Sequence, residues 1–107
     1  MHSITDLTTL RDALRAFCAA RDWHRFHTPK NLVMALSVEA AELVEHFQWA
    51  TPEESLNLAA QKRAEVADEI ADVLIYLTEL ADVLDIDPIA AARAKILKNA
   101  AKYPAPL

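Results

Sequence analysis

Glycine is absent from the 107-residue chain, although average usage of about 7% predicts about seven or eight glycines at this length. Walker-type phosphate loops and dinucleotide-binding fingerprints need glycine for close backbone approach, so both are excluded. Tight β-hairpins are disfavoured, because no position offers glycine's access to positive φ. Any phosphate bound by this chain must therefore be held by side chains and metal ions.

Cysteine occurs once, at Cys18, which excludes an internal disulfide and any zinc or redox motif built from several thiols. We expect Cys18 to be a small buried residue of the first helix. Long apolar runs and a basic, apolar leader are also missing, which predicts a soluble cytoplasmic protein without a membrane partner. The net charge of −5 argues against a nucleic-acid partner.

The residues that are present predict a single all-α domain over residues 1–107, since 53% are hydrophobic, 25% are charged, and apolar positions recur at helical spacing. We expect a first helix from about residue 6 or 8 and a second over about 30–48. A third helical segment should start at the capping box of residues 51–54 and continue over about 62–84, and a last helix should cover about 88–102. The weakly patterned residues 56–61 leave a break open. Short connections favour antiparallel packing as a four-helix bundle. Because the segment 30–48 is apolar almost all round, we also expect a homo-oligomer.

Two acidic pairs, Glu39 with Glu42 and Glu69 with Asp72, lie within the most apolar helical stretches. Residues three apart share one helix face, so two facing pairs could hold a hard divalent cation. Oxygen ligands favour Mg²⁺, with Mn²⁺ as a possible substitute. A di-iron carboxylate site ranks lower, because it needs a Glu-x-x-His motif that neither pair supplies.

A nucleoside polyphosphate is the ligand that we expect at such a site, because magnesium commonly takes substrate phosphates as ligands. The competing interpretation is that the pairs are only solvated faces of amphipathic helices. We favour the metal site, since both pairs share one spacing and both sit in apolar surroundings. Spacing alone does not name a reaction.

Four segments of the chain, residues 21–32, 39–49, 68–77 and 95–104, resemble the all-α, MazG-like nucleoside triphosphate pyrophosphohydrolases, in particular the dCTP pyrophosphatase-like branch. The family signature is a Glu-x-x-Glu helix followed by a Glu-x-x-Asp helix, which Glu39-Ala-Ala-Glu42 and Glu69-Ile-Ala-Asp72 match. The resemblance implies magnesium-dependent cleavage between the α and β phosphates, giving a nucleoside monophosphate and pyrophosphate. It also implies a homo-oligomer, either a dimer or a tetramer.

The resemblance also implies roles for individual residues. Metal ligands carry over onto Glu39, Glu42, Glu69 and Asp72, and Glu42 is the candidate catalytic base that orients the attacking water. The substrate-binding candidates are Trp23, His27, Trp49 and Tyr76 for the base and sugar, Lys95 and Asn99 near the phosphates, and also Arg25, Lys30 and Asn31 of the matched segment 21–32. Leu14 stands where this branch can carry a polar side chain, which bears on base preference.

The leading hypothesis is a pyrophosphohydrolase for dCTP or a modified pyrimidine deoxynucleoside triphosphate, acting in nucleotide pool sanitation. Within the same class of reaction, dUTP or phosphoribosyl-ATP is the alternative substrate. A different class is a catalytically idle helical oligomer that binds a nucleotide or a protein partner. The complete set of four carboxylates argues against the idle protein, because a degenerate site would be expected to lose at least one.

Overall fold

The computed structural model describes residues 3–106, and within that range all regular structure is helical, which confirms the all-α prediction. The elements are α1 (Leu7–Ala20), the 3-10 turn η1 (His24–Phe26), α2 (Pro29–Glu45), α3 (Pro52–Ser55), α4 (Ala60–Val83) and α5 (Pro88–Lys102). The structure confirms a helix break within residues 56–61, because α3 ends at Ser55 and α4 begins at Ala60. The second helix ends at Glu45, earlier than expected, and continues as a turn.

Side-chain caps explain where most of the helices begin. Asp6 accepts a hydrogen bond from the Thr9 backbone N–H at 2.8 Å, and Thr51 accepts one from that of Glu54 at 3.1 Å. The Glu54 side chain accepts in return from the Thr51 N–H, which confirms the predicted capping box. Asp87 caps α5 ahead of Pro88, which occupies the first turn of that helix.

Two aspartates adopt the left-handed backbone conformation. We had not expected this conformation in a sequence without glycine. Asp22 and Asp85 both have φ of 54° and follow the ends of α1 and α4. The N–H of Trp23 bonds to the Cys18 carbonyl at 3.0 Å, which completes a Schellman motif. Aspartate tolerates this conformation better than most residues, so it replaces the glycine usual at this position.

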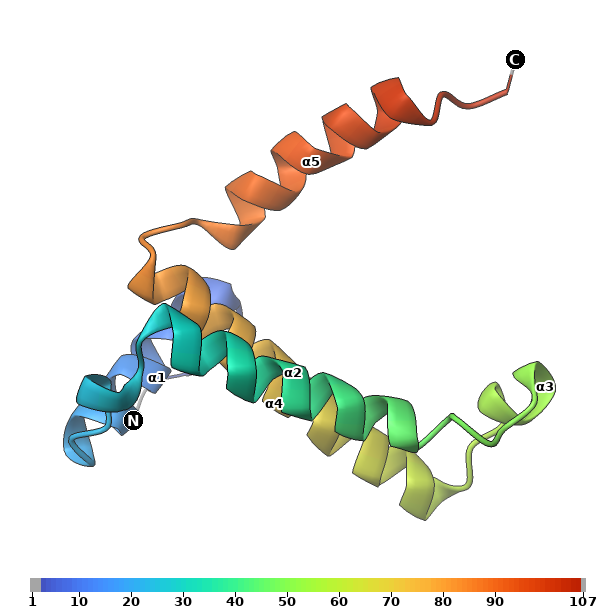
Figure 1. Cartoon of the computed structure of the whole chain (residues 1–107), viewed down its shortest axis with the longest axis horizontal. Helices are drawn as coiled ribbons and strands as arrows, with labels where there is room; N and C mark the ends of the chain where they lie inside the picture. Colours follow the sequence, from blue (N-terminus) through green and yellow to red (C-terminus); the bar gives the residue numbers. More distant parts are fainter. Residues whose placement is uncertain (1–2, 107) are drawn as a thin grey trace.

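The antiparallel pair α2 and α4 forms the centre of the fold, and α1 packs against α4 (Figure 1). Helix α5 projects away from them, and every described residue from 89 to 106 is exposed. The single chain is therefore not the closed four-helix bundle that short connections suggested. The reason is that α5 presents its apolar residues to solvent instead of packing them against α2 or α4.

The core of one chain is small. Among residues 3–106 only four hydrophobic side chains are buried, namely those of Cys18, Leu32, Val66 and Ala81. The burial of Cys18 agrees with expectation. None of the helices in that range combines the length and apolar character that a membrane span requires.

Leu32 is the side chain whose truncation should cost most, because it is only 1% exposed at the start of α2. We expect Leu32→Ala to lower the free energy of unfolding by about 2–5 kcal/mol, since a buried cavity replaces the side chain. The matched control is Arg63→Ala on the exposed face of α4, with an expected change below about 0.5 kcal/mol. Urea denaturation at one fixed protein concentration measures both. Equal effects would contradict the position of the core.

Candidate functional site

The packing of α2 on α4 gathers three of the four predicted metal ligands. One carboxylate oxygen each from Glu39, Glu69 and Asp72 lies within 4.8 Å of the other two. Oxygens that share one Mg²⁺ at about 2.0–2.1 Å lie at most about 4.2 Å apart, so small side-chain movements would complete such a site. Within residues 3–106, Glu39 Oε2 and Glu69 Oε2 are buried without a hydrogen-bond partner. Buried polar atoms normally have a partner, and a bound cation would supply one to both oxygens.

The electrostatics of the cluster agree with this interpretation. Burial, followed by the close carboxyl groups of Glu69, Glu42 and Asp72, raises the pKa of Glu39 to about 7. Several carboxylates in one partly buried place disfavour one another's charge unless a cation neutralises them. The arrangement is therefore suited to a divalent cation.

Glu42 occupies a different position from the other three. It is half-buried one turn after Glu39 on α2 and interacts with that residue, but it is outside the group of mutually close oxygens. A carboxylate beside the ligands, rather than among them, can accept a proton from a water at the cluster. Both predicted roles of Glu42, as catalytic base and as metal ligand, stay predictions.

An apolar cavity of about 340 Å³ adjoins the acidic cluster. It receives three of the predicted base and sugar contacts, Trp23, His27 and Tyr76, and also one carboxylate of the cluster, Asp72. The Schellman turn after α1 brings Trp23 to the rim, where its ring packs edge-on against Phe17 at 5.6 Å between centroids. Asp72 and Tyr76 line the cavity from successive turns of α4.

Several residues of this cavity were missed in the sequence. Leu10, Phe17, Ile75 and Glu79 line it, and Leu14, noted only as a departure, lies among them. Glu79 follows Asp72 by seven residues and Tyr76 by three, so its helical spacing was a usable signal. The apolar members were not recognisable, because they look like ordinary core positions.

Other predicted substrate contacts do not reach the cavity within one chain. Trp49 is 90% exposed in the turn after α2, while Lys95 and Asn99 lie on the projecting helix α5. Arg25 pairs with Asp22 at 3.4 Å and lies over the Phe26 ring, and the Asn31 amide donates to the Phe26 carbonyl at 2.9 Å. Lys30 is exposed at the start of α2. The roles of these residues stay predictions.

Comparison with known proteins assigns the class. The family model for MazG-like proteins matches residues 34–106, which hold both acidic pairs. The chain therefore belongs to the MazG-like family.

Individual relatives sharpen the comparison. The chain is 42% identical to human dCTP pyrophosphatase 1 over 104 residues, covering 92% of this chain and 61% of that protein. It is 43% identical to the rat protein of the same name over 101 residues, covering 90% and 59% respectively. The chain thus spans about three-fifths of the length of these curated relatives. A crystal structure of a pyrophosphatase from Archaeoglobus fulgidus superposes with a TM-score of 0.88 at 45% identity, covering 98% of both chains.

The raised pKa of Glu39 predicts how stability depends on pH when no metal is bound. A carboxyl whose pKa is 4.5 when unfolded and about 7 when folded stabilises the protein below pH 4.5 and loses that contribution as pH rises through 7. The free energy of unfolding of the wild type should therefore fall over this interval relative to Glu39→Gln, which stays neutral. Urea denaturation in chelator at a series of pH values measures the difference. Parallel pH profiles would contradict the assigned shift.

Proposed function

We propose that this chain is a magnesium-dependent pyrophosphohydrolase that cleaves a deoxynucleoside triphosphate between its α and β phosphates. The observation that carries the proposal is the position of Asp72, which belongs to the acidic cluster and also lines the cavity of Trp23 and Tyr76. A polyphosphate held at the cluster would thus have its nucleoside end directed into that cavity. The relatives named dCTP pyrophosphatase 1 and the archaeal pyrophosphatase support the same reaction.

The cluster supplies the charge that this chemistry needs. Glu39, Glu69 and Asp72, with Glu42 beside them, would hold Mg²⁺ or, as a substitute, Mn²⁺. When bound, the metal neutralises the polyphosphate and stabilises the charge that develops on the departing pyrophosphate. Glycine-free loops leave this task to side chains and metal.

Glu42 is the proposed catalytic base. Its carboxylate accepts a proton from a water positioned at the cluster, and the water oxygen bonds to phosphorus as the α–β bridge breaks. The bridging oxygen leaves with one product, and the products together are the nucleoside monophosphate and pyrophosphate.

The relatives named dCTP pyrophosphatase 1 support a pyrimidine nucleotide as the substrate. Trp23 offers an aromatic face that can stack on a base, and Tyr76 and His27 offer polar atoms for the sugar or base edge. Leu14 lines the cavity of Trp23 and Tyr76 at a position where the dCTP pyrophosphatase-like branch can carry a polar side chain. The more apolar wall makes a 5-modified pyrimidine nucleotide a second candidate substrate besides dCTP. We place the enzyme in cytoplasmic nucleotide pool sanitation, with free nucleotides rather than nucleic acid or membrane as partners.

We also propose that the functional unit is a homo-oligomer, a dimer or tetramer. Large apolar side chains remain exposed on α5, among them Ile89, Ile96 and Leu97, which are 50%, 65% and 71% exposed. An open apolar groove of about 530 Å³ lies at the other end of α2 and α4, and Leu43, Val44, Phe47, Gln48, Val66 and Ile70 line it. Apolar surface of this extent is typical of protein interfaces. Packing of α5 on a second copy would bring Lys95 and Asn99 toward that copy's acidic cluster.

Activity on purified protein tests the reaction. With Mg²⁺ and a panel of canonical and 5-modified deoxynucleoside triphosphates, dUTP and phosphoribosyl-ATP, we expect nucleoside monophosphate and pyrophosphate, with dCTP or a modified pyrimidine preferred. Glu42→Ala should reduce turnover by about 10²–10⁴-fold, as expected for a missing general base, while helical circular dichroism is retained. Product identification by ion-exchange chromatography measures both.

The matched control is Glu65→Ala, which removes an exposed carboxylate one turn from Glu69 and should leave turnover unchanged. Production of a diphosphate and free phosphate would overturn the proposed bond. Full activity of Glu42→Ala would remove that residue from the mechanism. Absence of turnover on every substrate would favour the idle nucleotide-binding oligomer.

Light scattering and mixing of inactive variants test the oligomer. We expect the mass of a dimer or tetramer at micromolar concentration. If the site spans two copies, refolding a mixture of Glu42→Ala and Lys95→Ala chains should restore part of the activity that each variant lacks alone. A monomeric mass would contradict the proposal, and an oligomer without restored activity would confine the site to one chain.

A further inference from the structure

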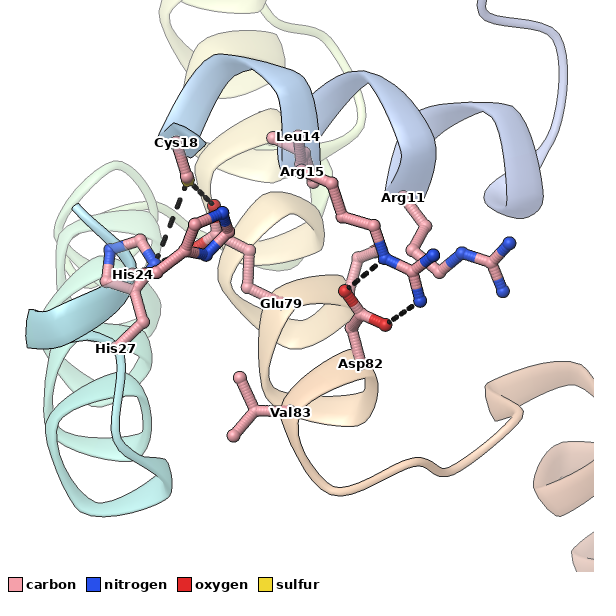
Figure 2. A pocket seen from close by; sticks show the side chains of 10 residues that line it. Arg11, Leu14, Arg15, Cys18, His24, His27, Glu79, Asp82 and Val83 are labelled. Carbon is pink, nitrogen blue, oxygen red and sulfur yellow. Dashed lines mark hydrogen bonds and ion pairs between the residues drawn. The ribbon is translucent and has the colours of Figure 1, made fainter. Parts of the chain in front are cut away.

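A second group of potential metal ligands lies apart from the acidic cluster, where α1, the segment after η1 and α4 meet. Cys18, His27 and Glu79 point toward one another there (Figure 2). Cys18 Sγ lies 3.5 Å from Glu79 Oε1 and 3.8 Å from His27 Nδ1, and His27 Nδ1 lies 3.8 Å from Glu79 Oε2. One ligand atom from each of these residues lies within 4.8 Å of the other two, so three donors of three different kinds form a compact triangle.

The size of the triangle fits one tetrahedral cation. With Zn–S near 2.3 Å, Zn–N near 2.0–2.1 Å and Zn–O near 2.0–2.2 Å, tetrahedral ligands lie about 3.3–3.6 Å apart. The Sγ–Oε1 distance of 3.5 Å lies within this range and the two distances of 3.8 Å lie slightly above it, with Cys18 and His27 contacting different oxygens of Glu79. A thiol and an imidazole are poor ligands for Mg²⁺, so this donor set selects a different metal from the acidic cluster.

The burial and the charge of these three side chains also suit a bound divalent cation. Cys18 is 2% exposed, and the His27 and Glu79 side chains are 17% and 11% exposed. One divalent cation with a thiolate, a carboxylate and a neutral imidazole makes a site of zero net charge, which suits a partly dry environment. Among the residues that the structure describes, the polar contacts of the Glu79 carboxylate are weak ones to the Cys18 thiol and the His27 imidazole.

The cluster also has an open side. It lines a cavity of about 240 Å³ whose far wall holds the ion pair of Arg15 and Asp82 (Figure 2). Three protein ligands with a fourth position open to solvent are the arrangement of zinc sites that exchange a water for a ligand.

We propose that Cys18, His27 and Glu79 bind one thiophilic divalent cation of the zinc class, at a site separate from the acidic cluster. His27 and Glu79 also line the cavity of Trp23 and Tyr76, so the bound cation would stiffen the wall shared by the two cavities. With Nδ1 bound to the metal, the neutral imidazole carries its proton on Nε2.

Binding exchanges a proton for the metal. Burial, followed by the charge of Glu79, raises the pKa of the Cys18 thiol to about 11, so the thiol is protonated before the metal arrives. A divalent cation reverses this by stabilising the thiolate. Each cation bound therefore releases the thiol proton.

Cobalt(II) provides the decisive probe. Because Cys18 is the only cysteine in the sequence, any thiolate-to-cobalt charge-transfer band in the near ultraviolet reports this site alone. With excess Mg²⁺ to saturate the acidic cluster, we expect one equivalent of Co²⁺ to produce the band and one of Zn²⁺ to abolish it. Saturating Co²⁺ without a charge-transfer band would overturn the proposal.

Variants assign the ligands, with circular dichroism as the check on folding. Cys18→Ser should abolish the band, and His27→Ala and Glu79→Gln should each weaken zinc binding at least about tenfold. The last two side chains are less buried than Cys18, so they keep the test valid if Cys18→Ser fails to fold. Unchanged zinc affinity in both would overturn the assignment.

Two controls separate this site from its surroundings. His24→Ala removes the other histidine that lines the same cavity and should leave zinc affinity unchanged, because His24 lies outside the triangle. The double variant Glu39→Gln with Glu69→Gln should retain the cobalt band. Loss of the band in the double variant would show that the two sites are not separate. These readouts do not depend on nucleotide hydrolysis, so they test this site independently of the proposed reaction.

Discussion

The antiparallel contact between α2 and α4 is the interaction on which the rest of the molecule depends. Each of these two helices carries a buried side chain, Leu32 on α2 and Val66 on α4, and their contact brings Glu39 close to Glu69 and Asp72. Carboxylates on the inside of a helix pair destabilise it while they are charged and unpaired. The charged carboxylates therefore destabilise the helix pair, and the proposed divalent cation would offset this destabilisation and so couple metal binding to helix packing.

The contact between α2 and α4 leaves much of the chain's apolar surface uncovered. Helix α5 is well formed, with a capped start, yet all of its residues after Pro88 are exposed. A helix of 15 residues with exposed Ile96 and Leu97 gains little stability from propensity alone and needs a packing surface. The proposed oligomer would supply that surface, and it would give the predicted substrate contacts Lys95 and Asn99 on α5 a second copy on which to act.

The cavity beside the cluster shares one wall with the proposed zinc site. His27 and Glu79 face both spaces, and Asp72 connects the nucleotide cavity with the acidic cluster. Hard oxygen donors gather at one end of this arrangement, and a thiol with an imidazole gathers at the other. The difference in donor chemistry would let two different cations occupy neighbouring sites without competing.

Local signals in the sequence were sufficient for several features. The capping box of Thr51 and Glu54, the proline after Asp87 and the periodic apolar residues predicted the helices closely, because each depends on residues within one turn. The spacing of Glu39 with Glu42 and of Glu69 with Asp72 pointed to a cation site for the same reason. The absence of glycine predicted the backbone conformation less well, since Asp22 and Asp85 adopt positive φ although neither is a glycine.

The sequence by itself determined the helices, the two acidic pairs and, through resemblance, the family. Only the tertiary structure decided which side chains meet: that Asp72 serves both cluster and cavity, that Glu42 stands beside the ligands, and that Cys18 lies against Glu79 across 61 positions of sequence. Periodicity specifies the face of a helix on which a residue lies. The rotation and crossing of one helix on another decide which faces meet, and these depend on the packing of many side chains at once.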